Sequence, residues 1–363
     1  MATKGFIIMT ESKTFLKKDT LTVKGIAIIL LLFYHLFESD ELITSMSVDY
    51  APFSKKVFLT LSGYSNICVA IFVFLSAYGI TKGLMDCSAY SLLPAIKQAY
   101  KRALKLIVNF AAMYISVNLL WFRHFDYTNL YGETPQGLIY VLLDALGLSE
   151  LLNTPTLNMT WWYMKLALSI IFLVPFLFPL LQKLGKYMLV PAFLLPFIVT
   201  LDSDVSRYFL VICLAMVTAY EKWFEKIFAF NLYKPVKLLA ALLLLALSVL
   251  IRQNYIVHSY FLWIVDAPIA FLICLFSAEF VSIIPGISQS LSFLGKHSMN
   301  IFFVHTFFYM ILYREFIYSF KYSWTILLVL IAITLVYSIL LEMLKSGIKL
   351  SIRCLKANSR RAS

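Results

Sequence analysis

The chain has 363 residues, of which 61% are hydrophobic and 14% are charged, and its formal net charge is +12. Soluble domains carry about 25% charged residues, so this composition and a mean hydropathy of +0.84 exclude a soluble protein and indicate a polytopic membrane protein. The basic residues are scattered between apolar runs and do not form one stripe, which argues against a nucleic-acid partner.

Apolar runs of about 17 to 25 residues predict about ten transmembrane helices in an all-α fold. A shorter run at 137–148 carries Asp144 and is too brief to cross, so we expect an interfacial or re-entrant helix there. The predicted domain covers 22–345, between a cytoplasmic segment at 1–21 and a basic cytoplasmic tail at 346–363. The predicted spans lie at roughly 22–38, 65–82, 104–122, 160–182, 186–201, 206–222, 236–252, 259–283, 290–312 and 323–344.

The distribution of basic residues predicts the orientation of the chain. With the N-terminus inside, most Lys and Arg fall in inner segments and most acidic residues fall outside. Both termini are therefore predicted to be cytoplasmic, in a multi-pass protein of a cell membrane, which we expect to be a bacterial plasma membrane. The basic N-terminus resembles a signal peptide, but the acidic segment 38–41 occupies the place of a cleavage site, so we interpret 22–38 as the first span.

The first span carries two ionisable residues, Lys24 and His35, which are expensive at membrane depth. On a helix their separation turns about 1100° and rises about 16 Å, so both side chains point the same way at different depths. One interpretation is a lysine that obeys the positive-inside rule and a histidine that anchors at the interface. The other makes His35 a general base, because imidazole can accept a hydroxyl proton near neutral pH.

Other motifs lie at the ends of later spans. Lys101, Arg102 and Lys105 form an inner basic cluster that would either anchor the helix or hold the phosphates of a cytosolic cofactor. In the ninth span, Ser298 and His305 share one helical face, whereas His297 is displaced by about 80° from His305, which argues against a metal site. The five cysteines form no CxxC pair and predict neither a metal site nor a disulfide framework.

Several polar or aromatic residues in other spans have a structural alternative. Ser76 belongs to a run of small residues that also suits close helix packing. Trp161 and Trp162 are typical of an aromatic belt at the membrane interface. Lys165 and Asp266 need polar partners, and we expect them to pair with each other or to approach the His35 cavity.

In this order, the motifs resemble membrane acyltransferase family 3, whose members O-acylate sugars and other envelope molecules. Lys24 stands where this family usually has arginine, Ala77 replaces a customary glycine, and Lys165 lies near the place of an acidic residue. The matching residues are Lys24, Gly25 and His35 of the first span, Phe72–Ala77 of the second, Arg102 and Lys105 of the inner loop, Trp161–Met164, and Gly295, Ser298 and His305.

The resemblance implies an O-acyltransferase that moves an acetyl or other short acyl group from cytoplasmic acetyl-CoA to a hydroxyl of a cell-surface glycan. Its partners would be membrane lipid, acyl-CoA and the glycan, with no metal, and the oligomeric state is left open. The implied catalytic residues are His35, Ser76, Ser298 and His305, with either histidine as the principal base. The implied cofactor site is Lys24, Lys101, Arg102 and Lys105, and the implied substrate site is Trp161, Trp162 and Asp266.

A second class of function remains open from the sequence, namely an exporter or flippase for a polysaccharide or lipid-linked glycan without acyl chemistry. Transporters commonly show internal repeats and helices broken in corresponding halves. The chain has neither pattern, so the sequence favours the enzyme.

Overall fold

The structure is a computed structural model that describes residues 13–38, 43–86, 90–198, 203–256 and 262–362. Regular structure in these residues is helical apart from an isolated bridge between Asp49 and Tyr322, which confirms the all-α class there. The main helices are α1 (Lys17–Phe37), α3 (Lys55–Tyr64), α4 (Cys68–Met85), α5 (Leu92–Trp121), α6 (Tyr127–Tyr131), α7 (Gln136–Ala145), α8 (Ser149–Leu152), α9 (Tyr163–Leu184), α10 (Leu189–Ile198), α11 (Ser203–Tyr220), α12 (Trp223–Ala229), α13 (Lys234–Ile256), α14 (Leu262–Phe276), α15 (Pro285–Thr306), α16 (Arg314–Tyr318) and α17 (Ser323–Ala362).

Seven helical segments in the described part of the chain are long and apolar enough to cross a membrane. The predicted fourth span and residues 186–198 of the predicted fifth fall in one of them, Met159–Ile198, which joins α9 and α10 through short turns. Residues 199–201 of the predicted fifth span lie outside the described residues. α11 and α15 occupy predicted spans but are not among the seven. The short helix α7 is apolar and lies where the non-crossing run is predicted. The count of ten spans and the orientation of both termini therefore stay predictions.

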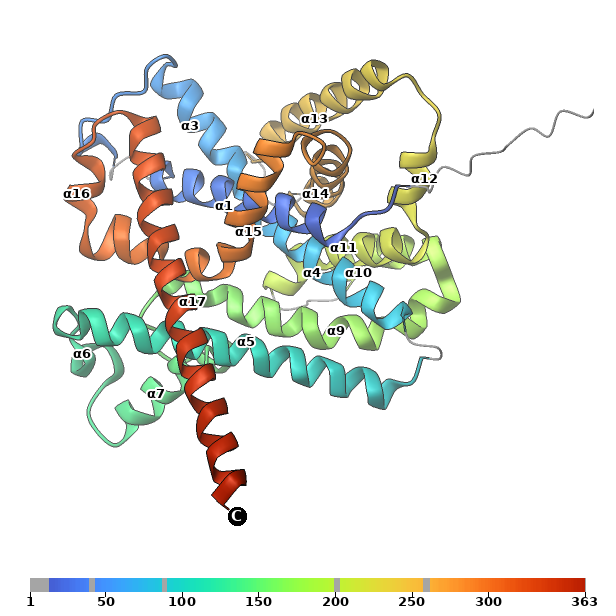
Figure 1. Cartoon of the computed structure of the whole chain (residues 1–363). Helices are drawn as coiled ribbons and strands as arrows, with labels where there is room; N and C mark the ends of the chain where they lie inside the picture. Colours follow the sequence, from blue (N-terminus) through green and yellow to red (C-terminus); the bar gives the residue numbers. More distant parts are fainter. Residues whose placement is uncertain (1–12, 39–42, 87–89, 199–202, 257–261, 363) are drawn as a thin grey trace, which may run out of the picture.

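The helices pack around α1 and α4, as Figure 1 shows. α1 has its most extensive contact with α15, which in turn contacts α17, while α4 packs against α11 and α9. α14 links α11 to α13, and α5 lies alongside α9. α17 has 40 residues, about 60 Å of helix against about 30 Å of hydrocarbon, so it extends well beyond the bundle.

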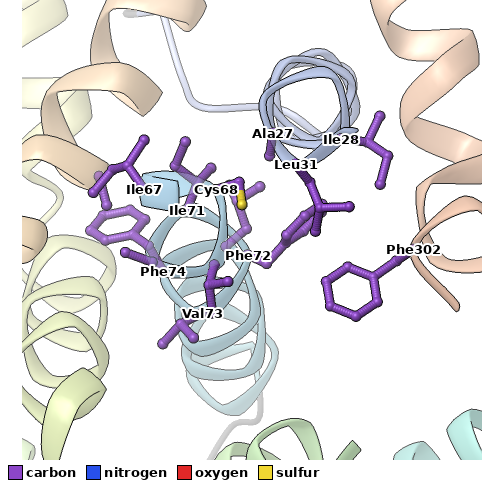
Figure 2. Packing of buried hydrophobic residues seen from close by; sticks show 14 of the residues in the cluster. Ala27, Ile28, Leu31, Ile67, Cys68, Ile71, Phe72, Val73, Phe74 and Phe302 are labelled. Atoms are coloured by element: carbon purple, nitrogen blue, oxygen red, sulfur yellow. The ribbon is translucent and has the colours of Figure 1, made fainter. Parts of the chain in front are cut away.

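The contact between α1 and α4 is apolar. Ala27 and Leu31 lie on the side of α1 that faces α4, and Phe72 and Phe74 extend from α4 (Figure 2). All four side chains are buried in one continuous core. Phe302 of α15 reaches the same region, with its ring 6.1 Å from that of Phe72. These contacts fix α1, α4 and α15 relative to one another, and these helices carry all four predicted catalytic residues.

Two prolines inside α9 create a local defect that another helix repairs. Pro179 has no N–H, so it cannot donate to the carbonyl of Pro175, four residues earlier. The hydroxyl of Tyr90, just before α5, donates to that carbonyl oxygen at 2.7 Å. An unpaired carbonyl is costly where water is excluded, so this bond both satisfies α9 and ties it to the start of α5.

The segment between α5 and α9 is held by Asp144 of α7. This side chain is only 1% exposed, and it accepts hydrogen bonds from the Tyr131 hydroxyl at 2.6 Å, the Thr156 hydroxyl at 2.8 Å and the Leu157 N–H at 2.7 Å. Burial raises the pKa of Asp144, although these donors oppose the shift. Asp144 in the short apolar run therefore has a structural role, because its hydrogen bonds hold the loop that leads into α9.

Candidate functional site

Two glycines bring α1 and α15 into backbone contact. A Cβ added at Gly25 would lie 2.1 Å from the carbonyl oxygen of Leu291, and one added at Gly295 would lie 1.9 Å from that of Leu21. Real Cβ atoms essentially never approach within 3.0 Å, so these positions require glycine. The Cβ added at Gly295 would also lie 3.0 Å from the backbone nitrogen of Gly25, so the two glycines meet at the crossing. His35 and His305 meet further along the same two helices, so the helices run parallel.

The crossing places two histidines side by side. His35 and His305 each follow the crossing glycine of their own helix by the same number of residues, and their ring centroids lie 5.0 Å apart. Nδ1 of His35 lies 3.0 Å from a carboxylate oxygen of Glu38. Nδ1 of His305 lies 2.6 Å from the carbonyl oxygen of Phe302. His305 is fully buried, and its Nε2 has no hydrogen-bond partner among the described residues.

A cavity of about 210 Å³ opens beside the stretch of α15 between the crossing and the histidine pair. It brings together three predicted site residues from three helices: Lys24 of α1, Ser76 of α4 and Ser298 of α15. The histidines are not among its lining residues. Phe302 connects the two features, because it lines the cavity and its ring lies 6.1 Å from that of His305.

The two serines are committed to their own helices in this conformation. The Ser76 hydroxyl donates to the carbonyl of Phe72 at 2.8 Å, and the Ser298 hydroxyl donates to the carbonyl of Gly295 at 2.9 Å. Tyr163 lines the cavity together with both serines. Either hydroxyl would have to rotate away from its carbonyl before it could donate to a developing oxyanion.

The four predicted phosphate-binding cations lie in different settings. Lys24 is half-buried and lines the cavity. The Arg102 guanidinium of α5 packs against Gly83 of α4, where an added Cβ would lie only 2.6 Å from it. Lys101 and Lys105 are exposed on α5 and do not line the cavity. The structure thus brings one of the four cations to the cavity itself.

Comparison with known families now identifies the chain. The acyltransferase domain model of acyltransferase family 3 matches residues 22–343, nearly the whole chain. The chain belongs to acyltransferase family 3. No curated protein and no solved structure matches it. The resemblance drawn from the motifs is therefore confirmed, and the chain is an acyltransferase with several helices suited to a membrane.

In this family 3 member, the two tryptophans do not line the cavity but contact residues that do. Trp161 is only 3% exposed, its indole N–H donates to the carbonyl of Phe303 at 2.9 Å, and its ring packs edge-on against Phe110. That N–H is therefore not free to bind an oxyanion in this conformation. Trp162 packs against Tyr163, and of these aromatic residues only Tyr163 and Phe303 line the cavity.

Asp266 pairs with Arg252 and not with Lys165, the partner expected from the sequence. It is 1% exposed and accepts from Nε of Arg252 at 2.8 Å, with Arg207 at 3.9 Å. Lys165 instead pairs with Asp204 at 2.9 Å. The predicted pairing of Lys165 with Asp266 is wrong, because the packing of α13 against α14 places Arg252 beside the acid. A role of Asp266 in substrate binding stays a prediction.

The candidate site includes residues that the sequence motifs do not single out. Glu38 contacts His35. This contact could have been predicted from the sequence, because Glu38 follows His35 by three residues at the end of the same helix and residues at this spacing are neighbours. Tyr163 and Phe302 line the cavity, but nothing in their local sequence separates them from many other aromatic residues. In the described residues, no group of three or more His, Cys, Asp and Glu side chains could hold a metal ion.

Proposed function

We propose that this acyltransferase moves an acetyl or other short acyl group from cytoplasmic acyl-CoA to a hydroxyl of an extracytoplasmic glycan. One observation supports this most: a cavity lined by Lys24, Ser76 and Ser298 lies beside the same parallel helix pair, α1 and α15, that holds two adjacent histidines. A donor entering near Lys24 and an acceptor entering near His35 would meet along that pair.

In the proposed reaction, the oxygen of the acceptor hydroxyl attacks the thioester carbonyl carbon, and a histidine of the pair accepts the proton of that hydroxyl. The new C–O ester bond forms as the C–S bond breaks, and the proton passes to the thiolate to give free CoA. Lys24 attracts the negatively charged donor. Ser76 or Ser298, after rotating, would donate to the oxygen that gains charge.

The test uses purified protein in proteoliposomes with radiolabelled acetyl-CoA inside and a candidate glycan outside. We expect label in the glycan, and we expect His35→Ala to lower the rate by about 10²- to 10⁴-fold, the range for a general base. His124→Ala is the matched control, because His124 is exposed and lies outside the pair. Lys24→Ala should raise KM for acetyl-CoA.

Two results would contradict the proposal. Acyl transfer at the normal rate in His35→Ala would show that His35 is not the general base. Glycan movement across the membrane that persists in that variant, without acylation, would indicate an exporter. Mass analysis of cell-surface polysaccharide with and without the chain would identify the acceptor, because each acetyl ester adds a fixed mass.

A further inference from the structure

Glu38 follows α1 and contacts the histidine at its end. We infer that Glu38 is a positioning residue that holds His35 in the tautomer whose Nε2 accepts the acceptor proton, and that this contact makes His35 the base and His305 its neutral neighbour. The inference rests on the proposed function and deepens it, since the motifs alone leave the choice between the two histidines open.

The contact with Glu38 assigns the tautomer of His35. An ionised carboxylate can only accept hydrogen bonds, so the 3.0 Å contact requires a hydrogen on Nδ1 of His35. In the neutral ring the lone pair is then on Nε2. Glu38 therefore leaves Nε2 free to accept a proton.

His305 is held in the same tautomer by a different group. Its Nδ1 lies 2.6 Å from the carbonyl of Phe302, which also can only accept, so the hydrogen is on Nδ1 and the lone pair is on Nε2. That Nε2 is buried, and no residue in the described part of the chain forms a hydrogen bond with it. Two rings 5.0 Å apart thus both present acceptor nitrogens, and neither can donate to the other. A hydroxyl group that enters here supplies the missing donor.

The surroundings of the two rings differ in charge. Accepting a proton creates an imidazolium, and beside Glu38 that charge is compensated, because a carboxylate orients and stabilises imidazolium. His305 is 0% exposed and faces a neutral carbonyl, so a positive charge there would be buried without a counter-charge. His35 therefore takes the proton, and His305 accepts a hydrogen bond that orients the hydroxyl.

The kinetic test compares Glu38→Ala with Glu38→Gln in the full chain. We expect Glu38→Ala to lower kcat about 10²-fold, since both the tautomer and the counter-charge are lost. Glu38→Gln should lose only about 10-fold, because its amide oxygen still accepts from Nδ1. KM for acetyl-CoA should not change in either variant, because the cavity beside Lys24 is intact. Glu133→Ala, an exposed acid in the loop after α6, is the control.

A second measurement does not depend on turnover. ¹⁵N chemical shifts of histidine-labelled protein, with the His35 signal assigned from His35→Asn, should report Nδ1–H in the wild type and a mixture of tautomers in Glu38→Ala. An unchanged tautomer, or wild-type kcat in Glu38→Ala, overturns the inference. If the wild type transfers no acyl group, or if His35→Ala is fully active, the proposed function fails instead.

Discussion

The glycine crossing gives the sharpest prediction, Gly295→Ala. The new Cβ would lie 1.9 Å from the carbonyl oxygen of Leu21, and it needs at least 3.0 Å, so α1 and α15 must separate by about 1.1 Å. Because both helices continue from this point to His35 and His305, the displacement is carried to the histidine pair. A misplacement of about 1 Å can cost about 10²-fold in rate, and overpacking costs about 1–3 kcal/mol of stability.

The assay measures acetyl transfer and the thermal midpoint of unfolding in one detergent. Gly286→Ala is the matched control, because Gly286 lies on the same helix and an added Cβ there meets nothing within 4 Å. We expect the control to keep wild-type activity and the crossing variant to lose both activity and stability. Wild-type kcat and midpoint in Gly295→Ala would refute the backbone contact and the argument that the crossing places the histidines.

Three further predictions concern buried polar groups. Asp266→Asn should cost about 3–5 kcal/mol, measured by unfolding, because Arg252 loses its counter-charge; Arg252→Met combined with Asp266→Leu should recover much of it. Tyr90→Phe should cost about 1–3 kcal/mol in the same assay, because the Pro175 carbonyl is left unpaired. Burial raises the pKa of Asp144 above its usual 3.8, so the folded state holds this proton to higher pH than the unfolded state, and stability should fall as pH rises from about 4 through the raised pKa. Thermal midpoints of Asp144→Asn should lack that slope.

The controls for these variants are simple. Tyr100→Phe, at a side chain that is 62% exposed, should leave the midpoint unchanged. A double variant at the ion pair that is as unstable as Asp266→Asn would contradict the argument from an uncompensated charge. A wild-type slope in Asp144→Asn would show that another acid causes the pH dependence.

The sequence by itself determined the class of the protein and offered candidate residues for its chemistry. Runs of apolar residues predict helices because the membrane leaves no other partner for the backbone, and the described residues are helical as predicted. The separation of Lys24 and His35 fixes their shared face through helix geometry alone. The order of the motifs sufficed for the family, which the match over 22–343 confirms.

Only the tertiary structure decided which of these residues meet. The distance between His35 and His305 depends on two glycines far apart in the chain that let two backbones touch. Asp266 could pair with any nearby cation, and the packing of α13 on α14 selects Arg252. Local periodicity gives each side chain a direction on its own helix, but the rotation and depth of one helix against another follow from contacts between segments distant in sequence.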